Sequence, residues 1–149
     1  MKAYSLEMEI GQPRAKIGEL FGDPENLVYW QPGFISSEPI EGASNQHRLI
    51  YSHGKGEMEM IETIEVDALP GEYTAVYSAK GMTMRVRNRF EEIDSQRTRW
   101  ISDNEAQTSG ILMKILGLLM PGCFKKQSRI FMENFKAFAE TGADVRKSG

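Results

Sequence analysis

A single glutamate, Glu62, interrupts apolar residues that alternate along a candidate strand. Met58, Met60, Ile64 and Val66 occupy every second position around it, so all five side chains are expected on one face of the strand. A buried carboxylate is costly unless it has a hydrogen-bond partner, a raised pKa or water in a cavity. Glu62 is therefore a candidate polar anchor for a ligand, or a candidate acid or base. The alternative is a glutamate at the mouth of the sheet whose side chain reaches solvent.

The turns that flank this strand predict which residues face Glu62. Closing the chain at the Pro-Gly turn of residues 70–71 places Tyr77 opposite Glu62. His47 or Leu49 lies on the other side, according to how the preceding hairpin closes. A tyrosine next to a carboxylate in a cavity is suited to binding a polar group or to moving a proton. The same register pairs four further sets of residues: Val66 with Tyr73, Ile64 with Ala75, Tyr77 with Met84, and Ala75 with Val86.

Asn88 and Ser102 form a second polar pair on the predicted inner face. A turn around Ser95 pairs them with each other and pairs Phe90 with Trp100. Their side chains are suited to orienting a ligand carbonyl or hydroxyl group. The alternative is that they hydrogen-bond to each other near the edge of the sheet.

Other chemistries find little support in the sequence. His47 and His53 would lie roughly 20 Å apart on one strand, too far to share a metal ion, and no other metal-ligand spacing is present. Cys123 has no neighbouring histidine in the sequence and is expected to be a buried, inert thiol on an apolar helix. We therefore expect no metal site and no cofactor.

The charge pattern argues against nucleic acid as a partner. Lysine and arginine number 18 and aspartate and glutamate 21, which leaves a net charge of −3. Five arginines are clustered in the chain, but the register sets three of them against acids on the outer face: Arg85 against Glu105, Arg87 against Asp103, and Arg99 against Glu91. This pattern predicts a solvated ladder of charges.

The surrounding elements must place these residues on one concave face. Residues 3–10 alternate like a strand, and two short helices are expected near Pro13 and from Asp23 to about Trp30. Strands joined by short turns then continue to about Gln107, which predicts an antiparallel meander. From Gly110 to about residue 140 the period is helical.

The apolar segment 110–124 is too short to span a membrane, since a spanning helix needs roughly 20 apolar residues. It is expected to form the first half of a long helix that covers the apolar face of the sheet, with a kink at Pro121. We predict that residues 110–120 are a mobile wall of the cavity entrance. The 149 residues are expected to form one domain, and the absence of an export signal together with a lone cysteine predicts a cytoplasmic location.

The opening of the chain, with Pro13, the "DPEN" segment of residues 23–26 and Trp30, resembles that of the SRPBCC superfamily, the START-like or Bet v 1-like group that includes polyketide cyclases and lipid-transfer domains. The later segments "RFEEIDSQRTRW" and "ENFKAFAE" are similar to a hairpin and the helix end of that group. The resemblance implies an α+β helix-grip fold: a curved antiparallel sheet of about seven strands around a long kinked C-terminal helix, with two short helices after the first strand. It carries no shared catalytic signature.

The predicted function is binding or carriage of a small hydrophobic ligand, lipid or polyketide-like, between the sheet and the C-terminal helix. The alternatives are a cyclase or dehydratase that uses Glu62 and Tyr77, and a co-chaperone-like interaction module. The sequence leaves monomer and homodimer open. The expected ligand-contacting residues are Tyr51, Met60, Glu62, Tyr77, Met84, Asn88, Trp100, Ser102, Ile115 and Leu119.

Overall fold

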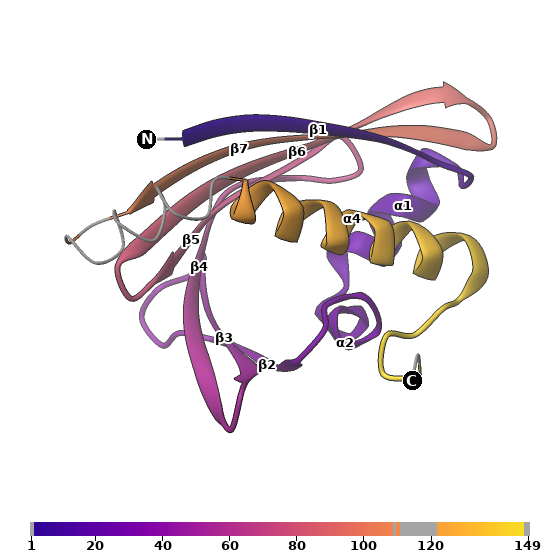
Figure 1. Ribbon diagram of the computed structural model, residues 1–149. Coiled ribbons are helices and arrows are strands. Elements are labelled where there is room, and N and C mark those ends of the chain that lie inside the picture. The colour runs from indigo at the N-terminus through magenta and orange to yellow at the C-terminus, as the bar shows by residue number, and fades with distance from the viewer. Residues whose placement is uncertain (1, 109, 111–121, 148–149) are drawn as a thin grey trace.

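Seven antiparallel strands form one curved sheet in the order β1-β7-β6-β5-β4-β3-β2, as the computed structural model shows (Figure 1). The structure describes residues 2–108, 110 and 122–147. The strands are β1 (Lys2–Ile10), β2 (Phe34–Pro39), β3 (Gln46–His53), β4 (Gly56–Ala68), β5 (Glu72–Ala79), β6 (Met82–Asp94) and β7 (Arg97–Thr108). The helices are α1 (Arg14–Gly22), the short 3-10 helix η1 (Pro24–Asn26), α2 (Leu27–Trp30) and α4 (Cys123–Thr141). The predicted fold class is confirmed.

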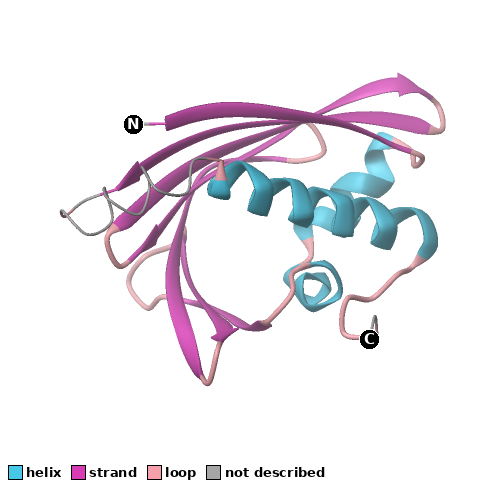
Figure 2. Cartoon of the chain, in the orientation of Figure 1, coloured by secondary structure: helices cyan, strands magenta, loops and turns pink. Residues whose placement is uncertain are grey.

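Helix α4 lies across the concave face of the sheet, and α1 and α2 close one end (Figure 2). The buried residues of α4 are Met132, Phe135 and Ala139. Their spacing follows the helical period, so one stripe of α4 faces the sheet. Gly142 ends the helix in a left-handed conformation, and its N–H bonds to the Phe138 carbonyl at 2.8 Å.

The prediction of one helix from Gly110 to about residue 140 needs correction. Gly122 has a φ of 85°, a left-handed conformation that interrupts a right-handed helix, so α4 begins only at Cys123. The prediction that the Cys123 thiol is buried is wrong, because this residue is exposed in the first turn of α4. The predicted kink at Pro121 lies outside the described part of the chain, and so does the predicted mobile wall of residues 110–120 apart from Gly110.

The predicted register is confirmed across β5, β6 and β7, including the pairs Tyr77–Met84, Phe90–Trp100 and Asn88–Ser102. Between β4 and β5 it is right for Glu62–Tyr77 and Ile64–Ala75, but wrong for Val66. A bulge between Ile64 and Val66 shifts the pairing by one residue, which places Asp67 opposite Tyr73. The shift moves Asp67 onto the face that carries Glu62.

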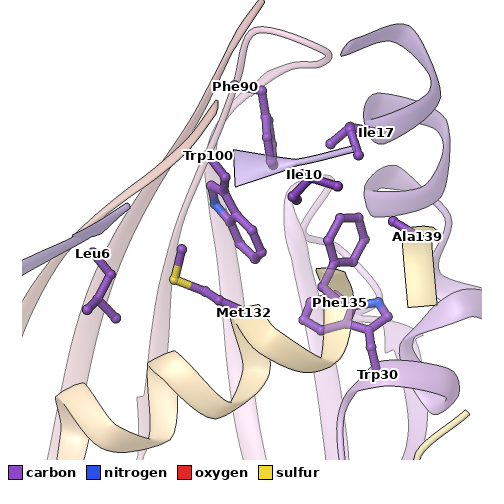
Figure 3. Close-up of a cluster of buried hydrophobic side chains, with 9 residues drawn as sticks. All are labelled: Leu6, Ile10, Ile17, Trp30, Phe90, Trp100, Met132, Phe135 and Ala139. Carbon is purple, nitrogen blue, oxygen red and sulfur yellow. The ribbon is translucent and has the colours of Figure 1, made fainter. Parts of the chain in front are cut away.

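The core lies where α4 meets β1, β6, β7 and the two N-terminal helices. Figure 3 shows its nine buried side chains, Leu6, Ile10, Ile17, Trp30, Phe90, Trp100, Met132, Phe135 and Ala139. Phe21 of α1 joins this cluster, because its ring lies 5.2 Å from that of Phe90 and 5.5 Å from that of Phe135. Aromatic edges packed on aromatic faces hold α1 and α4 together against the sheet.

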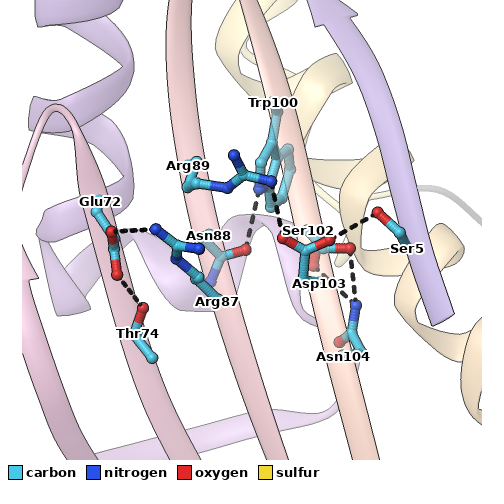
Figure 4. A network of polar contacts seen from close by, with 10 residues as sticks. All are labelled: Ser5, Glu72, Thr74, Arg87, Asn88, Arg89, Trp100, Ser102, Asp103 and Asn104. Carbon is cyan, nitrogen blue, oxygen red and sulfur yellow. Dashed lines mark hydrogen bonds and ion pairs between the residues drawn. The ribbon is translucent and has the colours of Figure 1, made fainter. Parts of the chain in front are cut away.

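On the outer face the arginines pair with acids, although most of them reach diagonally rather than straight across. Arg87 bonds to Glu72 at 3.2 Å and Arg89 to Asp103 at 2.9 Å (Figure 4). Arg85 pairs with Glu65 at 2.7 Å. Of the three predicted contacts, Arg99–Glu91 forms at 3.8 Å, whereas Arg85 and Arg87 pair with Glu65 and Glu72 instead of Glu105 and Asp103. The prediction is therefore right that these arginines pair with acids on a solvated face, but wrong for two of the three partners.

Candidate functional site

A cavity of about 210 Å³ lies between the N-terminal helices and strands β2–β5. Its apolar lining comes from both sides: Phe21, Leu27 and Trp30 from the helices, and Leu49, Ile64 and Leu69 from the sheet and the turn between β4 and β5. Its polar lining consists of Gln31, Ser37, His47, Glu62, Asp67, Tyr73 and Tyr77. The cavity is mainly apolar, and all but Gln31 and Ser37 of these polar residues lie on β3, β4 and β5.

Glu62 is at the centre of this polar group. Its Oε2 accepts a hydrogen bond of 2.9 Å from the Tyr77 hydroxyl, and its Oε1 lies 3.6 Å from Nδ1 of His47. The neighbouring strands produce this contact, since His47 and Tyr77 are the register partners of Glu62 on β3 and β5. The sequence left His47 and Leu49 as alternatives, and the structure selects His47.

Burial dominates the electrostatics of this carboxyl group. Only 13% of the Glu62 side chain is exposed, and desolvation raises the pKa of the carboxyl group, while hydrogen bonding from Tyr77 and the proximity of His47 oppose that rise. Burial next to Glu62 also raises the pKa of the Tyr73 and Tyr77 hydroxyl groups, so both tyrosines are neutral hydrogen-bond donors at neutral pH. A carboxyl group with a raised pKa keeps its proton to a higher pH than an exposed glutamate does, so it is better suited to donating a proton to a ligand.

Two buried polar atoms at this site have no hydrogen-bond partner among the described residues: Nε1 of Trp30 and Nδ1 of His47. Trp30 as a whole is 4% exposed. Buried polar groups in proteins are normally satisfied by protein, water or ligand. Both residues line the cavity, so a molecule bound there can supply the missing partners.

The predicted site residues divide into three groups. The first group, Glu62 and Tyr77, lines the cavity. The second group is not part of the lining of this cavity: Tyr51, Met60, Met84, Asn88, Trp100 and Ser102. Within it, the Tyr51 hydroxyl donates a hydrogen bond of 2.6 Å to Gln31, which does line the cavity. The third group, Ile115 and Leu119, falls outside the described residues.

The predicted pair Asn88 and Ser102 stand opposite each other but have separate partners. Asn88 accepts a hydrogen bond from Nε1 of Trp100 at 2.9 Å, and Asn104 donates to the Ser102 hydroxyl at 3.0 Å (Figure 4). All four side chains are buried. In this arrangement the amide of Asn88 satisfies a core tryptophan.

Of the residues that line this cavity, only Glu62 and Tyr77 were predicted as members of the site; Trp30, Asp67 and Tyr73 are among those that the sequence reasoning missed. Tyr73 was already expected on the inner face, and the alternation of apolar residues was the signal that could have identified it. Asp67 carried no such signal, because without the bulge it would face outward.

Within the described ranges, no group of three or more histidine, cysteine, aspartate or glutamate residues is arranged to hold a metal ion. Over the same residues, no helix is long and apolar enough to cross a membrane.

No protein-family model and no curated protein sequence matches the chain, but solved structures do. The chain is similar to the Zhui aromatase/cyclase from Streptomyces sp. R1128, with 14% identity, a TM-score of 0.73, and 99% of this chain and 98% of that chain covered. A conserved protein from Geobacillus kaustophilus is similar at 15% identity and a TM-score of 0.74, with 93% and 95% covered. This chain has a helix-grip fold.

The chain is also similar to part of a two-domain protein. The di-domain ARO/CYC BexL from the BE-7585A biosynthetic pathway matches with 13% identity and a TM-score of 0.75. The match covers 91% of this chain and 45% of that one. At such identities the likeness establishes the fold, and the function has to be argued from the site.

Proposed function

We propose that this protein binds a small, mainly apolar molecule in the cavity between the N-terminal helices and β2–β5, with a polar group of the ligand at Glu62. The observation that carries this proposal is a mainly apolar cavity that contains a buried carboxyl group and two buried nitrogen atoms without a hydrogen-bond partner among the described residues. Cavities of this composition, with a few convergent polar groups, are typical of small-molecule sites. The aromatase/cyclase names among the similar structures agree with a ligand of this kind.

The volume limits the size of the bound part. An engineered apolar cavity of about 150 Å³ is known to hold benzene. A cavity of about 210 Å³ therefore suits one substituted ring, or the ring end of a longer compound. A ligand of that size would contact the wall formed by Phe21, Trp30 and Tyr73.

The test uses phenethyl alcohol, a neutral single-ring probe, with binding followed by amide shifts in NMR spectra of the labelled protein. We expect saturable shifts around the cavity on β4, β5 and α2. Ser37→Trp should abolish them, because Ser37 lines the cavity and a large side chain there would fill it. Ser36→Trp is the matched control and should leave the shifts in place, because Ser36 is next to Ser37 on β2 and its side chain points to the opposite face of that strand. Shifts that are absent, or that survive in Ser37→Trp, would overturn the proposal.

The second candidate function is a cyclase or dehydratase type of enzyme, and the contact between Tyr77 and Glu62 favours it. Glu62 has a raised pKa, accepts a hydrogen bond from the neutral Tyr77 hydroxyl and lies 3.6 Å from a nitrogen of His47. A carboxyl group in this setting can transfer protons to and from a bound carbonyl compound. Incubation with a short poly-β-ketone should then yield a product lighter by one water, and Glu62→Gln should lose that product. If the compound is recovered unchanged, the enzymatic function is wrong and only the binding function remains.

A further inference from the structure

We propose that this cavity prefers small ring compounds that carry a basic amine and excludes compounds of the same size that carry a carboxylate. The inference rests on the proposed function and adds the charge class of its ligand. It comes from three features of the described lining: two carboxyl groups on one face, the absence of lysine and arginine, and a continuous aromatic wall.

The bulge in β4 brings the two carboxyl groups together. Because the pairing shifts after Ile64, Asp67 lies opposite Tyr73, and Glu62 lies opposite Tyr77 on the same face of the sheet. Both acids line the cavity, and the negative charge of Asp67 is one of the causes that raise the pKa of Glu62. An unbulged strand would direct Asp67 away from the cavity.

No lysine or arginine of the described chain lines the cavity, so nothing of fixed positive charge balances these acids. His47 is the one basic side chain in the lining, at 3.6 Å from Glu62. A buried carboxylate without a cationic partner is destabilised by the loss of its hydration. A bound ammonium group would supply that partner, and a bound carboxylate would add a third negative group to the same small volume.

The aromatic side chains of the lining suit a cation as well. The rings of Trp30 and Phe21 stack with centroids 5.8 Å apart, and Phe21 meets Tyr73 edge-on at 5.7 Å. Aromatic faces attract organic cations, most strongly where water is excluded. A ring with a short aminoalkyl chain would therefore contact this wall and direct its nitrogen towards Glu62.

The experiment compares three probes of one ring size, phenethylamine, phenethyl alcohol and phenylacetate, by NMR titration at neutral pH. We expect the amine to bind about 10-fold tighter than the alcohol or better, and phenylacetate to bind most weakly. Glu62→Gln should weaken amine binding about 10-fold and leave the alcohol nearly unchanged. Glu59→Gln is the matched control: this exposed glutamate of β4 pairs with Arg48, away from the cavity, and should change neither affinity. Asp67→Asn tests the second carboxyl group, which is more exposed than that of Glu62. It should weaken the binding of the amine without changing that of the alcohol.

The outcomes separate this inference from the function beneath it. If the alcohol or phenylacetate binds as tightly as the amine, the proposed charge preference is wrong, while the cavity remains a ligand site. An amine affinity that survives both Glu62→Gln and Asp67→Asn, or that persists in Ser37→Trp, also overturns the inference. If no probe binds, both proposals fail together.

Discussion

Nε1 of Trp100 donates a hydrogen bond of 2.9 Å to Oδ1 of Asn88, and both side chains are almost completely buried. The two residues lie on neighbouring strands, β6 and β7, and Trp100 packs against Phe90 and Phe135 in the core. The bond lets a polar indole nitrogen occupy an apolar interior without the penalty of an unmet donor. Asn88 therefore stabilises the fold next to the cavity.

Asn88→Leu should reduce the free energy of unfolding by about 1–3 kcal/mol, because the variant leaves the Trp100 N–H buried and unsatisfied. Urea denaturation followed by circular dichroism would measure this loss. In the background of Trp100→Phe the same substitution should cost much less, since no donor remains. Equal losses in both backgrounds would show that the hydrogen bond contributes nothing.

Tyr77→Phe should raise the pKa of Glu62 further, because the Tyr77 hydroxyl is the largest of the groups that lower it. A titration of the glutamate side-chain carboxyl carbons by NMR measures that pKa directly. Tyr51→Phe is the control, since the Tyr51 hydroxyl bonds to Gln31 instead. A Glu62 pKa that stays unchanged, or falls, in Tyr77→Phe would contradict the hydrogen bond.

Glu62→Gln should make the protein more stable than the wild type at alkaline pH and about equally stable near pH 4. The folded-state pKa of Glu62 lies above its usual value of 4.5, so its stabilising contribution is complete below that value and declines as the pH rises to the folded-state pKa. Glutamine imitates the protonated form at every pH. Chemical denaturation at several pH values would show whether the difference grows with pH. If the stability difference between Glu62→Gln and the wild type is the same at every pH, or if Glu59→Gln shows the same pH dependence, the effect does not come from the raised pKa of Glu62.

Gly18→Ala should destabilise the protein by about 1–3 kcal/mol, although alanine is the better helix former. A Cβ atom at this position of α1 would lie 2.7 Å from Cβ and 3.0 Å from Cα of Pro70, in the turn between β4 and β5. The turn cannot move aside as a flexible side chain would. Ala15→Gly, at an exposed position of the same helix, measures the propensity of α1 without this contact. A stabilised Gly18→Ala variant would mean that helix and turn separate easily.

Much of the sheet could be predicted from the sequence because its determinants are local. Alternation of apolar residues identifies a strand face, and short turns fix the pairing that follows, so Tyr77 could be placed opposite Glu62 and Phe90 opposite Trp100. The helical period towards residue 140 likewise predicted a C-terminal helix, which the structure contains as α4. For these elements the neighbouring residues along the chain carry enough information.

Only the tertiary structure decided the character of the site. The bulge that brings Asp67 to the face of Glu62 is a backbone irregularity with no periodic pattern of its own, and it depends on how β4 bends against β5. The choice of Trp100 as partner for Asn88, and the wall formed by Trp30, Phe21 and Tyr73, depend on side chains that meet across elements far apart in sequence. Periodicity determines which face a residue takes, whereas the neighbours that it meets on that face follow from packing in three dimensions.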